Sequence, residues 1–148
     1  MKPSGNPWTL SSILLALTGT TLVVAGLYFV LLRPPLLPED VRYMSLSTVE
    51  LDAVRPRLEA WLTHVFRVMG GYVIATGVLT VTLAATSFRA HHRGAGTGAL
   101  LGGAASIGWM AVVNFMINSD FKWVLLVFAF TWAASIAAFV MEARRSVR

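Results

Sequence analysis

The sequence contains no cysteine and few charged residues. The absence of cysteine excludes disulfide bonds, thiol catalysis and zinc–thiolate sites. Hydrophobic residues make up 56% of the 148 residues and charged residues 13%, and this charged share is about half of that in a typical soluble domain. The charges lie in short zones that leave apolar stretches of roughly 20 residues, the length needed to cross a bilayer. Composition therefore indicates an integral membrane protein.

Acidic groups are also missing from the apolar stretches. No Asp or Glu lies deep in any of them, so the sequence offers no carboxylate that would couple proton movement to transport. This argues against a multidrug exporter and against an ion pump. The sequence has no Ser-His-Asp set, no phosphate-binding glycine loop, no nucleotide fingerprint and no carboxylate dyad. We therefore expect a protein that is not an enzyme and that binds no cofactor.

Neither a metal nor a nucleic acid is an expected ligand. His91 and His92 would need further metal ligands that the sequence does not supply, so a solvated turn is the better interpretation. The net charge is +5, but the basic residues are few and many of them flank apolar stretches, where positive charge normally sets orientation. The expected partners are membrane lipid and either a protein partner or a second copy of the chain.

Four apolar stretches predict an all-α, four-helix membrane bundle that forms one domain over residues 1–148. The expected spans are 10–32, 60–88, 97–117 and 123–141. Arg33, Pro34 and Pro35 end the first span, because a double proline cannot continue the helical hydrogen-bond ladder.

The connection over residues 33–59 is long, whereas the other two are tight turns. Its prolines predict a stiff, extended start. Ser47 and Glu50 fit a capping box, and the residues that follow are apolar along one face. They predict a short amphipathic helix at the membrane surface, interrupted near Arg55 and Pro56.

Charge density predicts the orientation of the bundle. An even number of spans places both ends of the chain and the turn at 89–96 on one side. Each side carries six basic residues: Lys2, Arg89, Arg93, Arg144, Arg145 and Arg148 on the side of the chain ends, and Arg33, Arg42, Arg55, Arg57, Arg67 and Lys122 on the other. The first six lie in short flanks with Glu142 as their only acid, whereas all other acids lie on the opposite side. We expect both ends in the cytoplasm of a bacterial inner membrane, with the long loop outside.

Small residues recur at helical spacing in the second and third spans. Gly94, Gly98 and Gly102 are spaced by four residues and Gly103 adjoins the last of them, while the second span offers Gly70 and Gly71. Close backbone approach at small residues drives helix association in lipid. We expect these glycines to pack the second span against the third, within one chain or between two copies.

Polar residues near membrane depth gather at the loop end of the spans. His64 and Arg67 lie one turn apart, as do Asn114 and Asn118. The candidate ligand-binding residues are Arg67, His64, Asn114, Asn118, Asp120, Glu39, Asp40, Arg42 and Tyr43. Either Arg67 contacts an anionic head group or a carboxylate in a polar pocket, or it pairs structurally with Asp120 or Glu39.

Two segments carry a resemblance to a known group of proteins. Residues 33–43 (RPPLLPEDVRY) and 65–72 (VFRVMGGY) resemble uncharacterised four-span bacterial inner-membrane proteins of the DoxX-like kind, in which an Arg shortly before a Gly-Gly pair also opens the second helix. The resemblance implies a compact bundle of bacterial origin and brings no catalytic residues.

Two functions are consistent with these features. The first is a non-enzymatic accessory or interaction subunit of a membrane assembly. The second is a binder or carrier of a lipid-like or small amphipathic molecule, held near Arg67, His64 and Asn114 at the extracytoplasmic end.

Overall fold

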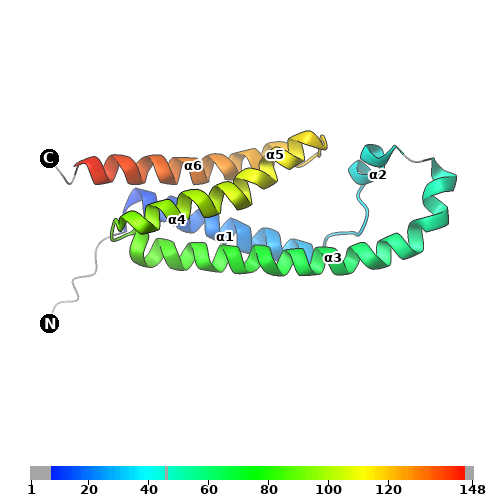
Figure 1. Ribbon diagram of the computed structural model, residues 1–148, viewed down its shortest axis with the longest axis horizontal. Coiled ribbons are helices and arrows are strands. Elements are labelled where there is room, and N and C mark those ends of the chain that lie inside the picture. The colour runs from blue at the N-terminus through cyan, green and yellow to red at the C-terminus, as the bar shows by residue number, and fades with distance from the viewer. Residues whose placement is uncertain (1–7, 46, 146–148) are drawn as a thin grey trace.

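The computed structural model describes residues 8–45 and 47–145, and these contain helices and no strand (Figure 1). The expected all-α class with four long apolar helices is confirmed. Lys2 and Arg148, which entered the orientation argument, lie outside the described residues. The elements are α1 (Leu10–Leu31), α2 (Pro38–Met44), α3 (Thr48–Leu83), the π-helical segment η1 (Ala84–Phe88), α4 (Arg93–Gly103), the π-helical segment η2 (Ala104–Gly108), α5 (Trp109–Met116) and α6 (Lys122–Arg145).

Four helical stretches of the described chain are long and apolar enough to cross a membrane. They are Leu10–Leu31, Val49–Phe88, Arg93–Met116 and Lys122–Arg145. In the most apolar 18-residue segment of the first stretch, only 28% of the residues are buried inside the protein. In the corresponding segments of the other three stretches the buried share is 17%. Large apolar side chains such as Leu31, Leu79 and Phe130 are exposed. Soluble proteins rarely expose so much contiguous apolar surface. The chain is therefore a multi-pass membrane protein.

Helix α3 is longer than the sequence predicted. The capping box is present, because Ser47 Oγ accepts from the Glu50 N–H at 3.3 Å and Glu50 Oε2 accepts from the Ser47 N–H at 2.9 Å. The predicted interruption near Arg55 and Pro56 is absent, and the helix continues for 36 residues. Arg55 forms ion pairs with acids before and after the proline, at 3.3 and 3.9 Å, which support the helix across it.

The length of α3 carries it beyond the membrane. At 1.5 Å per residue it measures about 54 Å, against about 30 Å of hydrocarbon. Its N-terminal part extends past the end of α1 and bends there (Figure 1), as expected near Pro56, which removes one backbone donor. Helix α3 is therefore longer than one crossing needs, and most of its charged residues lie in its N-terminal part.

Two glycine pairs hold α1 against α3. A Cβ atom on Gly26 would lie 2.7 Å from the carbonyl oxygen of Gly70, and a Cβ atom on Gly77 would lie 2.6 Å from that of Gly19. Each glycine therefore permits a backbone approach that any side chain would block. Gly70 was expected to join the second span to the third, and the structure instead places it against the first.

Helix α1 is the centre of the bundle. It packs against α3 on one side and against α6 on the other, while α4 and α5 lie mainly along α6. The buried core lies at the end where the chain turns from α3 to α4 (Figure 1, left), and there the rings of Phe88 and Phe139 stack with centroids 4.4 Å apart. We call this the His91 end of the bundle and the opposite end the α2 end.

Candidate functional site

At the α2 end, helix α2 is fastened to the turn between α5 and α6. The carboxylate of Glu39 is buried and accepts a hydrogen bond from Ser119 Oγ at 2.8 Å. Arg42 donates to Asp120 Oδ1 at 3.1 Å and to the carbonyl oxygen of Asn118 at 3.3 Å. Three of the predicted site residues, Glu39, Arg42 and Asp120, thus serve to dock the loop.

Arg33 fastens the same loop to α1 and α3. Its guanidinium donates to Asp40 Oδ2 at 3.1 Å and lies 3.6 Å from the ring centroid of Phe66. The Arg33 side chain is only 9% exposed. Asp40 Oδ2 also accepts from the Leu37 N–H at 2.9 Å, which caps α2. The sequence did not indicate Arg33 as a residue that fastens the loop. The signal that would have identified this role is an acid, Asp40, seven residues later.

The remaining predicted residues do not converge on one cavity. Asn114 donates to the Met110 carbonyl of its own helix at 2.9 Å. The side chains of His64, Arg67 and Tyr43 are exposed and form no hydrogen bond or ion pair within 8–45 and 47–145. The two acids proposed as partners of Arg67 are engaged elsewhere: Glu39 with Ser119 and Asp120 with Arg42. Asn118 accepts from the Lys122 ammonium group.

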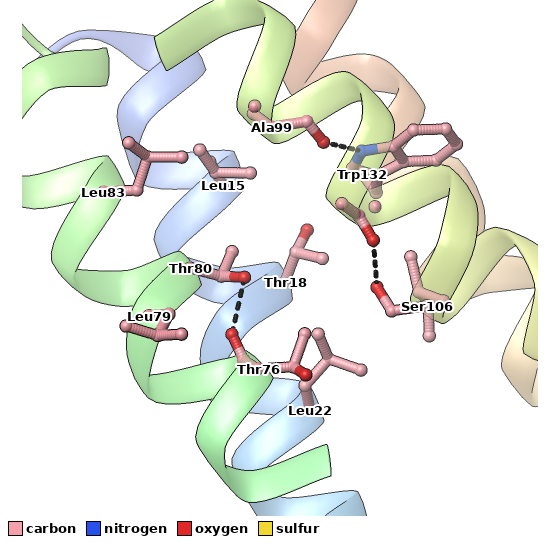
Figure 2. A pocket seen from close by; sticks show the side chains of 14 residues that line it. Leu15, Thr18, Leu22, Thr76, Leu79, Thr80, Leu83, Ala99, Ser106 and Trp132 are labelled. Carbon is pink, nitrogen blue, oxygen red and sulfur yellow. Dashed lines mark hydrogen bonds between the residues drawn. The ribbon is translucent and has the colours of Figure 1, made fainter. Parts of the chain in front are cut away.

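A cleft of about 210 Å³ lies between α1, α3 and α4, away from all of these residues. Figure 2 shows leucines of α1 and α3 on one wall and Ala99, Ser106 and Trp132 on the other. The indole of Trp132 donates to the Ala99 carbonyl at 3.0 Å. A Cβ atom on Gly103 would overlap this indole, so Gly103 is what lets the ring lie against α4.

The cleft contains hydroxyl groups whose donors are already used. Thr76 donates to the Tyr72 carbonyl at 2.8 Å. Figure 2 shows that Thr80 donates to the carbonyl of Thr76, at 2.8 Å, and Ser106 to that of Gly102, at 2.6 Å. Each hydroxyl oxygen keeps acceptor capacity. The cleft is therefore an apolar space with a few available acceptors.

One wall of the cleft is an open glycine strip. Gly94, Gly98 and Gly102 lie on successive turns of α4, and a Cβ atom on any of them would meet nothing within 4 Å. Gly98 and Gly102 line the cleft directly. The strip that the sequence indicated as a packing surface therefore has no helix against it within the described chain.

A polar cluster at the His91 end was missed by the sequence analysis. The carboxylate of Glu142 accepts from Ser11 Oγ at 2.5 Å, from the Ser11 N–H at 3.2 Å and from His91 Nε2 at 3.0 Å. The His91 ring stacks on Phe139 with centroids 5.1 Å apart. These contacts tie the start of α1 to the end of α6, and they depend on helix packing that no local pattern encodes. His91 is thus partly buried, whereas His92 is exposed.

The described residues contain no group of three or more His, Asp or Glu side chains that could hold a metal ion. Comparisons of the chain with protein families, with curated proteins and with solved structures found no match. The resemblance to DoxX-like proteins therefore stays a prediction.

Proposed function

We propose that this chain is a non-enzymatic accessory subunit that receives a helix of a partner membrane protein in the cleft between α3 and α4. The observation that carries this proposal is the open strip of Gly94, Gly98 and Gly102, which has no neighbour within 4 Å of a Cβ position.

The physical basis is that lipid provides no hydrophobic drive between helices. Helices associate there through close packing at small residues and through hydrogen bonds between helices. The two glycine pairs between α1 and α3 are already filled. The strip on α4 also consists of glycines, and no other helix packs against it within the described chain. A further helix would therefore gain the most packing energy by docking there.

The shape of the cleft suits apolar side chains of such a helix. An apolar cavity of about 150 Å³ holds a molecule of benzene, so a cleft of about 210 Å³ accommodates an aromatic side chain or a pair of branched ones. The oxygens of Thr76, Thr80 and Ser106 accept a hydrogen bond from a polar residue of the partner. A hydrocarbon-tailed small molecule in the same cleft is the second candidate.

The proposed location is a bacterial inner membrane with the His91 end in the cytoplasm. Arg93, Arg144 and Arg145 at this end are exposed, while the basic residues of the α2 end are accompanied by acids. Basic residues close to the ends of the spans favour the cytoplasmic side, whereas Arg55 and Arg57 at the α2 end lie away from the span ends.

The proposal is tested by blocking the strip. Gly98→Leu with Gly102→Leu places two large side chains in the cleft, and Ala134→Leu, at an exposed position of α6, is the matched control. Native mass spectrometry of gently extracted protein is expected to show a stoichiometric partner chain in the wild type and the control. The double variant is expected to lose it.

Three outcomes contradict the proposal. They are a wild type that carries no partner chain, a partner that survives the double variant, and a partner that the control also loses. A small molecule released by the double variant, with no partner chain, supports the second candidate instead.

A further inference from the structure

The basic residues at the α2 end divide into paired and unpaired ones. Arg33, Arg42 and Arg55 form ion pairs with Asp40, Asp120 and Asp52, and Lys122 donates to Asn118. The side chains of Arg57 and Arg67 are exposed and have no partner within the chain that the structure describes. Of these two arginines, Arg67 is the one that lies next to the apolar part of α3.

Arg67 shares a face of α3 with other unpartnered groups. His64 lies one turn before it and Arg57 two further turns away, and all three side chains are exposed. The acids of this part of α3, Asp52 and Glu59, bind Arg55 on another face. The face is therefore positively charged and no acid of the described chain compensates it.

The level of Arg67 in the bundle is the edge of the hydrocarbon. It lies directly after Phe66, whose ring is 6.1 Å from that of Phe29 in the last turns of α1. It lies just before Gly70, which belongs to the first glycine pair within the span. An arginine that faces lipid near the end of a span extends its guanidinium to the head-group level, where the phosphates of lipids are within its reach.

Below Arg67 the same face offers room for a hydrocarbon chain. Gly71 follows by one turn, and a Cβ atom there would meet nothing within 4 Å. Further along, a shallow groove of about 280 Å³ lies between α1 and α3, lined by Thr20, Val23, Val78, Val81 and Thr82. Thr20 and Thr82 donate to carbonyls of their own helices, at 2.9 Å each, so the groove presents no unused donor.

The spacing matches a lipid that lies along the helix. Residues 67, 71, 78 and 82 are separated by four, seven and four positions, which keeps them on one side of α3. Val78 lies about 16 Å from Arg67 along the axis. A charged group and an apolar groove are thus aligned parallel to the membrane normal.

We propose that this face binds one anionic phospholipid of the leaflet at the α2 end. The guanidinium of Arg67 and the imidazole of His64 hold its phosphate, since guanidinium forms paired hydrogen bonds with phosphate oxygens. One acyl chain passes Gly71 and enters the groove between α1 and α3. Arg57 adds positive potential above the head group. The α3 residues that line the cleft proposed for a partner helix, such as Thr76 and Thr80, lie on another face of the helix, so the two sites are independent.

The test is titration of the purified full-length protein in detergent with phosphatidylglycerol, followed by native mass spectrometry. One molecule of phosphatidylglycerol is expected to bind, with an affinity at least tenfold higher than that of phosphatidylcholine. Arg67→Gln is expected to weaken phosphatidylglycerol binding about tenfold, and Arg93→Gln, an exposed arginine at the His91 end, is the matched control and is expected to leave it unchanged. Gly71→Leu obstructs the acyl path from a position where an added Cβ atom meets nothing within 4 Å, and it is expected to weaken binding as well.

Each alternative has its own result. Equal losses in the Arg67→Gln and Arg93→Gln variants, or equal binding of the two lipids, would overturn the site as a specific one. Displacement of the lipid by excess inorganic phosphate, or unchanged binding in Gly71→Leu, would overturn the role of the groove. Unaltered helical circular dichroism and melting temperature of the variants are required for these readings. The Gly98→Leu and Gly102→Leu double variant is expected to lose the partner chain and still bind phosphatidylglycerol. This result distinguishes a failure of the lipid site from a failure of the proposed function.

Discussion

The hydroxyl of Ser119 donates a 2.8 Å hydrogen bond to the carboxylate of Glu39, a residue only 6% exposed. This bond joins residues 80 positions apart and connects α2 to the turn before α6. Because a buried carboxylate without donors is costly, the bond fixes where the long loop lies on the bundle.

We predict that Ser119→Ala destabilises the protein by about 1–3 kcal/mol, because it leaves an acceptor of Glu39 buried without this donor. Arg42→Gln, which breaks an ion pair whose two side chains are 52% and 64% exposed, is expected to cost about 0–1 kcal/mol. Denaturant unfolding in detergent, followed by circular dichroism, measures both. A larger loss for Arg42→Gln would contradict the assignment of Glu39 and Ser119 as the main fastening.

Adjacent glycines are predicted to respond in opposite ways. Gly70→Ala brings a Cβ atom within 2.8 Å of the Gly26 carbonyl oxygen, so α1 and α3 must separate. Gly71→Ala meets nothing within 4 Å and gains helix propensity worth about 0.5–1 kcal/mol. Thermal melting of the two variants should therefore show a lower midpoint for Gly70→Ala and an unchanged or higher one for Gly71→Ala. Equal midpoints would show that the packing of α1 on α3 is looser than described.

These two glycines also show how far the sequence predicts the structure. Apolar runs of about 20 residues identify the spans, because the bilayer sets that length. The two glycines are chemically identical and adjacent, and a rotation of about 100° between them decides which one contacts α1. That decision depends on the arrangement of four helices, which the spacing of small residues does not specify.

The charged residues show a different case, in which the decisive contact is local. Arg33 and Arg67 both adjoin an apolar span, and the sequence offered a structural pairing with a loop acid for Arg67 but none for Arg33. In the structure Arg67 pairs with neither Asp120 nor Glu39. Arg33 ties the loop to the bundle, because the Pro34–Pro35 turn brings Asp40 back to the Arg33 guanidinium. A local turn forms this ion pair. A search of the sequence for acids within about ten residues of each basic residue would have identified it.

We predict that Arg33→Lys loosens α2. Lysine keeps the charge but cannot bind Asp40 in the same way while its charged group covers the ring of Phe66, which costs about 1–2 kcal/mol. Backbone amides of α2 should then exchange hydrogen about tenfold faster. Arg67→Lys is the control and should leave this exchange unchanged. Protection of α2 that survives Arg33→Lys would mean that Glu39 alone holds the loop.

We predict that Glu142→Ala destabilises the His91 end. It removes the acceptor of two hydrogen bonds from Ser11 and one from His91, and Ser11 is fully buried. The expected cost is about 1–3 kcal/mol, with faster hydrogen exchange in the first turns of α1. Asp120→Ala, which loses an exposed ion pair at the other end, should cost about 0–1 kcal/mol. Equal effects of the two variants would contradict a structural role for the cluster.

The proposed orientation is open to a direct labelling test, because the sequence has no cysteine and therefore no background. Tyr43→Cys places a thiol at an exposed position of the α2 end, and Ala90→Cys places one at an exposed position of the His91 end. With the His91 end in the cytoplasm, a membrane-impermeant maleimide should label Tyr43→Cys in cells whose outer layers admit the reagent. It should label Ala90→Cys only after the inner membrane is opened. The reverse pattern would invert the orientation, and it would move the phospholipid bound at Arg67 to the cytoplasmic leaflet. Labelling of both positions in intact cells would contradict a closed four-span topology.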